Sequence, residues 1–212
     1  EWIKDKDSYE NIKGFITEKL KFVENINIQF KPKDVILFGF GRIGRLLARE
    51  LMSQKGKGEQ LRLRVIVLRN IDDISIIKRA SLLRTDSVHG KFPGTVITDL
   101  ENKALIINGH SVKLIEASNP EEVNYTKYGI NNALLIDNTG VYRDKKALTR
   151  HLKAAGVSKV LLTAPGNKIP NIVFGANHLN YDINSFDIFS AASCTTNAIT
   201  PILKVVNDKL GI

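Results

Sequence analysis

A short apolar run that leads directly into a glycine-rich turn constrains this chain more than any other feature. The run is Val35-Ile36-Leu37-Phe38 and the turn is Gly39-Phe40-Gly41-Arg42-Ile43-Gly44; residues 45–53 then show helical spacing of leucines. This order predicts a strand, a tight turn and a helix. Gly39 would permit the turn, Gly41 would let a pyrophosphate approach the backbone, and Gly44 would allow close packing of helix on strand. A purely structural glycine turn is the alternative.

If the turn binds a dinucleotide, the phosphates lie at the N-terminus of the helix that follows it. The predicted cofactor-binding residues of this turn are Gly39, Gly41, Arg42, Ile43 and Gly44.

Strand and helix patterns alternate through the rest of the chain. Buried strands are predicted at 61–68, 133–137, 159–163 and 171–175, and helices at 74–83 and 144–155. This alternation indicates an α/β protein with a doubly wound parallel sheet, a Rossmann-type NAD(P)-binding domain. Asn119-Pro120-Glu121-Glu122 is typical of a helix start. Three β-rich runs at 95–99, 104–107 and 112–115, the last two joined by Asn108-Gly109, predict a small antiparallel insertion.

The end of the second strand normally selects the cofactor, because an acid there binds ribose hydroxyls and an arginine suits a 2′-phosphate. Here the chain has Arg69, Asn70 and then Asp72 and Asp73. Asp72 can equally be the N-cap of the following helix. The residues therefore leave NAD and NADP both open.

Two further strand ends fall at the carboxyl edge of the predicted sheet, where ligands bind in this class of fold. One ends at Thr139-Gly140 and the other at Thr163. We include Thr139, Gly140 and Thr163 among the predicted cofactor-binding residues.

The only cysteine, Cys194, follows a predicted strand at 185–191 and begins a predicted helix that extends to about Lys209. A helix N-terminus favours the thiolate, which is the reactive form of cysteine. A lone cysteine is otherwise most often a small buried apolar residue. Its placement together with the glycine-rich turn favours a catalytic nucleophile.

Composition bounds the class of protein. The 212 residues are 43% hydrophobic, which is enough for a sizeable core, and a single cysteine excludes an internal disulfide. Apolar runs are all shorter than the roughly 18 to 20 residues that cross a bilayer. We expect a cytoplasmic protein without a metal site.

The formal net charge of +9 lies entirely in residues 35–212, because residues 1–34 carry seven basic and seven acidic side chains. The basic residues form no run of five and no aromatic-interleaved motif, which argues against nucleic acid as a partner. A site for phosphorylated small molecules accounts for the sign equally well. We expect a helical extension at 1–33, a dinucleotide-binding domain at 34–193, and the start of a catalytic domain at 194–212.

Six motifs together resemble the glyceraldehyde-3-phosphate dehydrogenase family, and they occur in the family's order. The motifs are the glycine-rich turn extended to Arg45, Asp86-Ser87-Val88-His89-Gly90, Asn138-Thr139-Gly140-Val141, Thr163-Ala164-Pro165, Val173-Phe174-Gly175-Ala176-Asn177-His178 and Ala192-Ser193-Cys194-Thr195-Thr196-Asn197.

The resemblance implies a phosphorylating dehydrogenase whose partners are glyceraldehyde 3-phosphate and inorganic phosphate, and which assembles as a homotetramer. Cys194 would attack the aldehyde, hydride would pass to the nicotinamide, and phosphate would cleave the thioester. Ser193 and Thr195 resemble the family's phosphate-contacting hydroxyls, and helix capping is their alternative role.

Several positions depart from the family pattern. The family's catalytic histidine follows the cysteine, whereas the last histidine here is His178, so we expect the cofactor-binding portion of a longer enzyme, inactive alone. His89, His110 and His151 are expected to be surface or loop residues rather than substitute bases. Ile71 occupies the place of the family's acid, and Ser118 that of an arginine near the adenine.

Two alternative functions stay open. An erythrose-4-phosphate dehydrogenase would share the fold and the nucleophile. A non-catalytic dinucleotide-binding protein would share the fold alone.

Overall fold

The structure is a computed structural model that describes residues 11–24, 31–54 and 60–211. The chain forms two compact units, Glu1–Lys31 and Pro32–Ile212, and each is described by itself. In the first unit the described part holds one helix, α2 (Ile12–Glu24). Residues 1–10 and 25–30 of the predicted helical extension lie outside the described residues.

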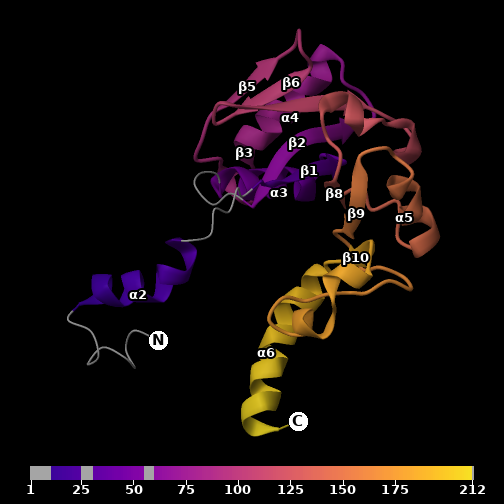
Figure 1. Cartoon of the computed structure of the whole chain (residues 1–212). Helices are drawn as coiled ribbons and strands as arrows, with labels where there is room; N and C mark the ends of the chain where they lie inside the picture. Colours follow the sequence, from indigo (N-terminus) through magenta and orange to yellow (C-terminus); the bar gives the residue numbers. More distant parts are fainter. Residues whose placement is uncertain (1–10, 25–30, 55–59, 212) are drawn as a thin grey trace. The chain divides into compact units, whose positions relative to one another are not determined.

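The second unit is built on an eight-stranded sheet with the order β10-β9-β8-β1-β2-β7-β6-β5 (Figure 1). The six strands from β10 to β7 run parallel, and β6 and β5 continue the sheet antiparallel. The doubly wound fold with an antiparallel insertion is therefore confirmed. The strands are β1 (Lys33–Phe38), β2 (Leu61–Leu68), β5 (Val96–Asp99), β6 (Ala104–Ile107), β7 (His110–Glu116), β8 (Ala133–Asp137), β9 (Val157–Leu162) and β10 (Ile188–Ser190).

Strand β1 lies in the middle of the sheet and has apolar side chains on both faces. Val35 and Leu37 belong to one core cluster, and Ile36 and Phe38 to the other, with all four buried. A parallel strand covered on both faces requires such a continuous apolar run. The run that precedes the glycine-rich turn is thus the centre of both cores.

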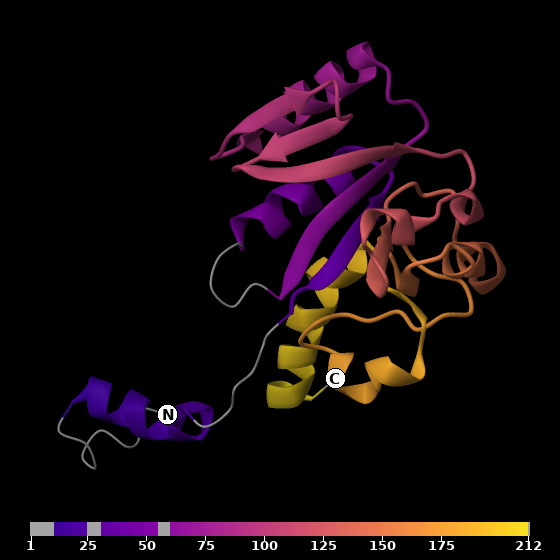
Figure 2. The same ribbon diagram turned by 45° about the horizontal axis from the view of Figure 1, so that its top comes forward.

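Helices cover the two faces separately, and Figure 2 shows α3 and α5 on opposite sides of the strands. The first core contains residues of α3 (Arg42–Ser53) and α4 (Asp73–Arg84). The second contains residues of α5 (Lys145–Leu152) and of the single-turn η3 (Tyr125–Tyr128). Helix α6 (Cys194–Leu210) follows β10, and none of its residues is buried.

The local signals in the sequence explain most element boundaries. Asp72 and Asp144 cap α4 and α5 by accepting a hydrogen bond from a backbone N–H three residues on. Asn108 and Gly109 both have positive φ, +48° and +80°, as a two-residue hairpin turn requires. The motif that begins at Asp86 lies on the short pair β3 (Thr85–Asp86) and β4 (Gly90–Lys91) and on the turn between them.

The predicted strand at 171–175 is wrong. Asn171 forms only an isolated bridge to Ser190, and the chain then turns. The side chain of Asn177 accepts a hydrogen bond from the Val173 N–H (2.7 Å) and donates one to the Asn171 carbonyl (3.0 Å). It therefore occupies the backbone groups that a neighbouring strand would pair, and Gly175 at φ +81° completes the turn.

The helix predicted to start at Asn119 is only one turn, η2 (Pro120–Glu122). Its start has the expected chemistry, since the Asn119 N–H donates to Glu122 Oε2 (3.1 Å). Val123 and Tyr125 are both buried in the second core. The chain must leave the helical path to bury them, so burial outweighs the start signal.

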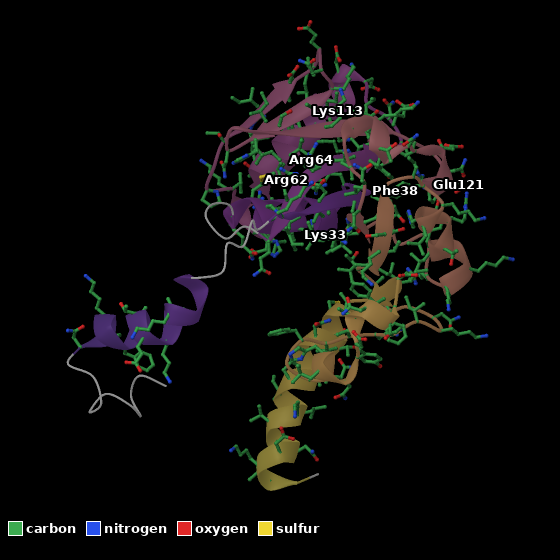
Figure 3. All side chains as sticks on the ribbon, in the orientation of Figure 1. Lys33, Phe38, Arg62, Arg64, Lys113 and Glu121 are labelled. Atoms are coloured by element: carbon green, nitrogen blue, oxygen red, sulfur yellow. The ribbon has the colours of Figure 1, made fainter. Side chains whose placement is uncertain are left out.

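Charged residues gather at the amino edge of the sheet, where Figure 3 shows Lys33 and Arg62 away from Phe38, the last residue of β1. Arg62 and Arg64 both pair with Asp34, at 2.8 and 3.4 Å. Lys33 donates to Asn132 and Ser158. These contacts connect the amino ends of β1, β2, β8 and β9, at the edge of the sheet opposite to the predicted site. Among the described residues, no helix is long and apolar enough to cross a membrane.

Replacement of Leu37 tests the central role of β1. Leu37 has no exposed surface, so Leu37→Ala should lower the free energy of unfolding by about 2 to 5 kcal/mol. Ile97→Ala, on edge strand β5 with a 56% exposed side chain, should change it by about 0.5 kcal/mol or less. Urea unfolding followed by circular dichroism measures both, and equal losses would contradict this account of the core.

Candidate functional site at the carboxyl edge of the sheet

Strand β1 is the point where the order of the sheet reverses, with β2 on one side and β8 on the other. The turn after β1 and the loop after β8 are in close contact there. Gly39 has φ +91°, and a Cβ on it would lie 3.0 Å from Thr139 Cγ2. A Cβ on Gly44 would lie 2.6 Å from the Gly39 carbonyl oxygen. Gly39 is therefore required by its left-handed backbone conformation and Gly44 by close packing, as the sequence predicted.

Gly41 differs from these two glycines because no atom lies within 4 Å of the place where its Cβ would be. It is the N-cap residue of α3, and no side chain caps this helix. The first N–H groups of α3 thus face open space, where an anion can approach the backbone. The residues fit the diphosphate of a dinucleotide.

A cavity of about 330 Å³ opens at this crevice. It brings together Gly39, Gly41, Arg69 and Thr139 of the predicted residues. Its other lining residues are Phe38, Phe40, Val67, Leu68, Arg79, Ala117, Ser118, Asn138, Val141 and Tyr142. Arg42, Ile43, Gly44, Asn70, Asp72, Gly140 and Thr163 do not line it.

Arg79 is the charged lining residue that sequence reasoning missed. It lies on α4, three residues after Ile76 and four before Leu83, which are both fully buried. Residues at this spacing share one face of a helix. An arginine on the apolar face of the predicted helix was the sequence signal that could have identified Arg79 as a site residue.

Asp72 caps helix α4, which is the alternative role that its position suggested. Its Oδ1 accepts the Ser75 N–H at 2.6 Å, and its own N–H donates to Asn70 Oδ1 at 2.7 Å. The Ser75 N–H is the main cause that holds the pKa of Asp72 below its usual range. Both predicted side chains are thus engaged in local hydrogen bonds.

Asp137, the last residue of β8, connects three parts of the site although it has no exposed surface. Its Oδ1 accepts hydrogen bonds from the Thr139 N–H and hydroxyl, both at 2.7 Å. Its backbone carbonyl accepts the Thr163 hydroxyl at 2.9 Å. Thr139 and Thr163 are therefore both oriented by one residue at the strand ends.

The second carboxylate oxygen of Asp137 lies 2.8 Å from His151 Nε2. His151 is also fully buried, on α5, with its ring edge-on to Phe38 and Tyr142. The expectation that His151 is a surface or loop residue is wrong. Its ring packs against Phe38 and Tyr142, which both line the cavity.

Cys194 is exposed and is the first residue of α6. Ala192, two residues earlier, has φ +59°, which a residue with a side chain rarely adopts. Asn197 holds this sharp turn by donating to the Ala191 and Ser193 carbonyls. The turn presents the thiol at a helix N-terminus, as the sequence predicted.

The hydroxyl of Ser193 caps α6 by accepting the Thr196 N–H at 2.9 Å, which is the alternative role considered for it. Thr195 is exposed at the same helix end. Contacts of Ser193 and Thr195 with a phosphate stay predictions.

Arg42 is directed away from the cavity, toward the loop that begins at Asp86. Its Nε lies 3.6 Å from Asp86 Oδ2. The Asp86 carboxylate accepts the N–H groups of His89 and Val88, and these bonds are the main cause of its strongly lowered pKa. His89 is, as expected, a hydrogen-bonded loop residue. Within the described part of the chain, no three His, Cys, Asp or Glu side chains are grouped so that they could hold a metal ion.

Comparison with known proteins identifies the family. Residues 33–145, more than half of the chain, match the family described as "Glyceraldehyde 3-phosphate dehydrogenase, NAD binding domain". The chain belongs to the glyceraldehyde-3-phosphate dehydrogenase family. The match covers the glycine-rich turn, the Asp86 loop and the Thr139 loop.

Individual relatives agree with this assignment. The chain is 56% identical over 181 residues to a glyceraldehyde-3-phosphate dehydrogenase-like protein of Pseudomonas aeruginosa, an alignment that covers 84% of the chain and 39% of that protein. It is 40% identical over 179 residues to glyceraldehyde-3-phosphate dehydrogenase 2 of a Nostoc species and 37% over 178 residues to glyceraldehyde-3-phosphate dehydrogenase 1 of Kluyveromyces lactis. Each covers 84% of the chain and 50% of the relative. The chain thus spans half or less of the length of these relatives.

The Asp86 loop should stabilise the fold in a pH-dependent manner. Because folding lowers the pKa of Asp86 from its unfolded value of about 3.9, its contribution is present above that pH and is lost as the pH falls through the lower folded value. We expect Asp86→Asn to lower stability most at pH 7, and the difference from the unchanged protein to shrink below about pH 4. Urea unfolding between pH 3 and pH 7 measures it. A difference that stays constant over this range would show that the charge of Asp86 is not the cause.

Proposed function

We propose that this chain is the dinucleotide-binding part of a phosphorylating glyceraldehyde-3-phosphate dehydrogenase. It would bind NAD or NADP at the β1–β8 crevice and supply Cys194 as the nucleophile for the aldehyde of glyceraldehyde 3-phosphate. The observation that carries the proposal is that Gly41, Thr139 and Cys194 all follow the carboxyl ends of strands in the parallel part of one sheet.

The sheet sets the spacing between these groups. Cys194 follows β10, and β10 is three strands from β1. Neighbouring strands are about 4.8 Å apart, so the two strand ends are about 14 Å apart in the sheet. The diphosphate region and the thiol therefore belong to one continuous edge, with the Thr139 and Thr163 loops between them.

Each residue has a defined chemical role in this proposal. The bound nicotinamide would supply the hydride acceptor. The Cys194 thiolate would form a bond to the aldehyde carbon, and inorganic phosphate would later displace the thiolate from the acyl group. The N–H groups at the start of α6 stabilise negative charge at the sulfur. Ser193 and Thr195 lie beside Cys194 where they can contact a phosphate.

The described residues offer no histidine with its ring free beside Cys194. His89 and His151 pair with Asp86 and Asp137, and His178 accepts the Gly175 N–H through Nδ1. His110 is exposed on β7, at the other end of the sheet. We infer that turnover requires a base from another part of a longer protein. The homotetramer, the glycolytic role and the cytoplasmic location form part of this proposal on the family resemblance.

Gly41→Ala tests cofactor binding. The added methyl group would occupy the open space through which the diphosphate reaches the backbone, so we expect at least a tenfold loss of NADH and NADPH affinity, about 1.4 kcal/mol. Fluorescence titration of the 212-residue chain measures it. Gly14→Ala in α2, where only Asn11 Oδ1 lies within 4 Å of the added Cβ, is the matched control. Absence of binding of either dinucleotide to the unchanged chain would contradict the proposed function.

Acetyl phosphate tests the nucleophile independently of the missing base. The Cys194 thiolate should attack its acyl carbon, forming a C–S bond while the C–O bond breaks and inorganic phosphate leaves. We expect a thioester on the peptide that contains Cys194, detected by mass spectrometry, and its loss in Cys194→Ala. Labelling confined to lysines, with Cys194 unmodified, would contradict the role given to this residue.

A further inference from the structure

The end of the cavity that lies beyond β2 has an unusual charge. Its wall there is formed by Arg69 after β2, Arg79 on α4 and the Ala117-Ser118 segment after β7. Among the residues that the structure describes, two arginines line the cavity and no aspartate or glutamate does. A wall that must bind only the neutral hydroxyls of a ribose would present an acid instead.

The two guanidinium groups keep hydrogen-bond donors for a ligand. Arg69 is exposed and forms no ion pair or hydrogen bond within the part of the chain that the structure describes. Arg79 is half-buried and uses Nη1 to donate to the Phe40 carbonyl at 3.1 Å. A guanidinium has five N–H donors, so this bond orients Arg79 and leaves most of its donors available.

The acids near this end of the cavity are engaged elsewhere. Asp72 caps α4 through the Ser75 N–H, and the side chain of Ile71 packs against the first core. Glu116, at the end of β7, accepts the Ile71 N–H at 3.4 Å and does not line the cavity. The positive charge of the wall is therefore not neutralised by a carboxylate of the cavity.

Arg79 is one of several arginines that lie close to Arg45. The pKa of Arg45 is lowered first by burial and next by the charge of Arg79, with Arg42 and Arg49 acting in the same direction and Asp86 opposing them. A phosphate monoester carries a charge between −1.5 and −2 near pH 7. Such a group beside Arg79 would relieve the repulsion between these arginines.

We propose that Arg69 and Arg79 form a subsite for a phosphate on the adenine ribose, so that this chain prefers NADP to NAD. Charge-assisted hydrogen bonds from two guanidinium groups would hold the phosphate. The hydroxyl of Ser118, on the same wall, is positioned to add a third donor. This inference rests on the proposed dinucleotide-binding function.

Calorimetric titration of the 212-residue chain with NAD and with NADP, at one fixed ionic strength because salt screens such contacts, tests the subsite. We expect NADP to bind at least tenfold more tightly than NAD. Arg69→Ala and Arg79→Ala should each reduce this preference, and together they should abolish it.

Matched variants separate the subsite from general effects. Arg62→Ala removes the same charge from the amino end of β2, where Asp34 keeps Arg64 as a partner, and should leave the preference unchanged. Arg69→Ala is the variant least able to disturb folding, since Arg69 forms no hydrogen bond or ion pair among the described residues. Circular dichroism of each variant checks that it is folded.

The outcomes distinguish this inference from the function on which it rests. Equal or tighter binding of NAD, or a preference for NADP that survives loss of both arginines, would overturn the subsite and leave the dinucleotide-binding function intact. Failure of the unchanged chain to bind either dinucleotide would overturn both.

Discussion

The carboxyl edge of this sheet depends on one buried carboxylate. Burial of an aspartate costs free energy unless hydrogen bonds satisfy its oxygens. Asp137 meets this condition by bonding to the Thr139 backbone and hydroxyl and by facing His151, while its carbonyl receives the Thr163 hydroxyl. Because each partner belongs to a different segment, the same bonds that make burial of Asp137 tolerable also fix the loops after β8 and β9 and the position of α5. These hydrogen bonds therefore hold the loops of the edge where a cofactor would lie.

The two ends of this edge are organised by different means. Around β1 the backbone itself forms the site, since Gly39 and Gly44 permit contacts that no side chain would allow and Gly41 leaves its space open. At Cys194 side chains shape the turn, through the cap of Ser193 and the bonds of Asn197 that hold Ala192 at positive φ. A phosphate is recognised by N–H groups common to every residue, whereas a nucleophile needs a particular atom in a particular place. The sequence reflects this difference in glycines at one end and in small polar residues at the other.

Patterns that act locally predicted most of the fold. The apolar run of β1, the turn at Asn108-Gly109 and the start of α5 near residue 144 each depend on a few neighbouring residues, and the structure has them where expected. The failures occur where a distant contact decides. The side chain of Asn177 forms hydrogen bonds with the backbone of the segment at 171–175, so this segment does not pair as a strand. The burial of Val123 and Tyr125 ends the single turn that begins at Pro120. In the sequence, His151 has the pattern of an ordinary polar residue of a helix. Only the fold shows that Asp137 of β8 lies beside it.

The predicted site shows the same limit. Arg69 could be named from its place at the end of β2, because the strand alone determines where that residue lies. Arg79 could not, because its presence in the cavity follows from the packing of α4 against the first core and from its bond to the Phe40 carbonyl. The hydrogen bond that makes Asp72 the cap of α4 keeps the nearest acid in the sequence out of the cavity. A single helix placement therefore brings in a positive charge and withdraws a negative one, and the charge of the cavity is a property of the fold rather than of any one motif.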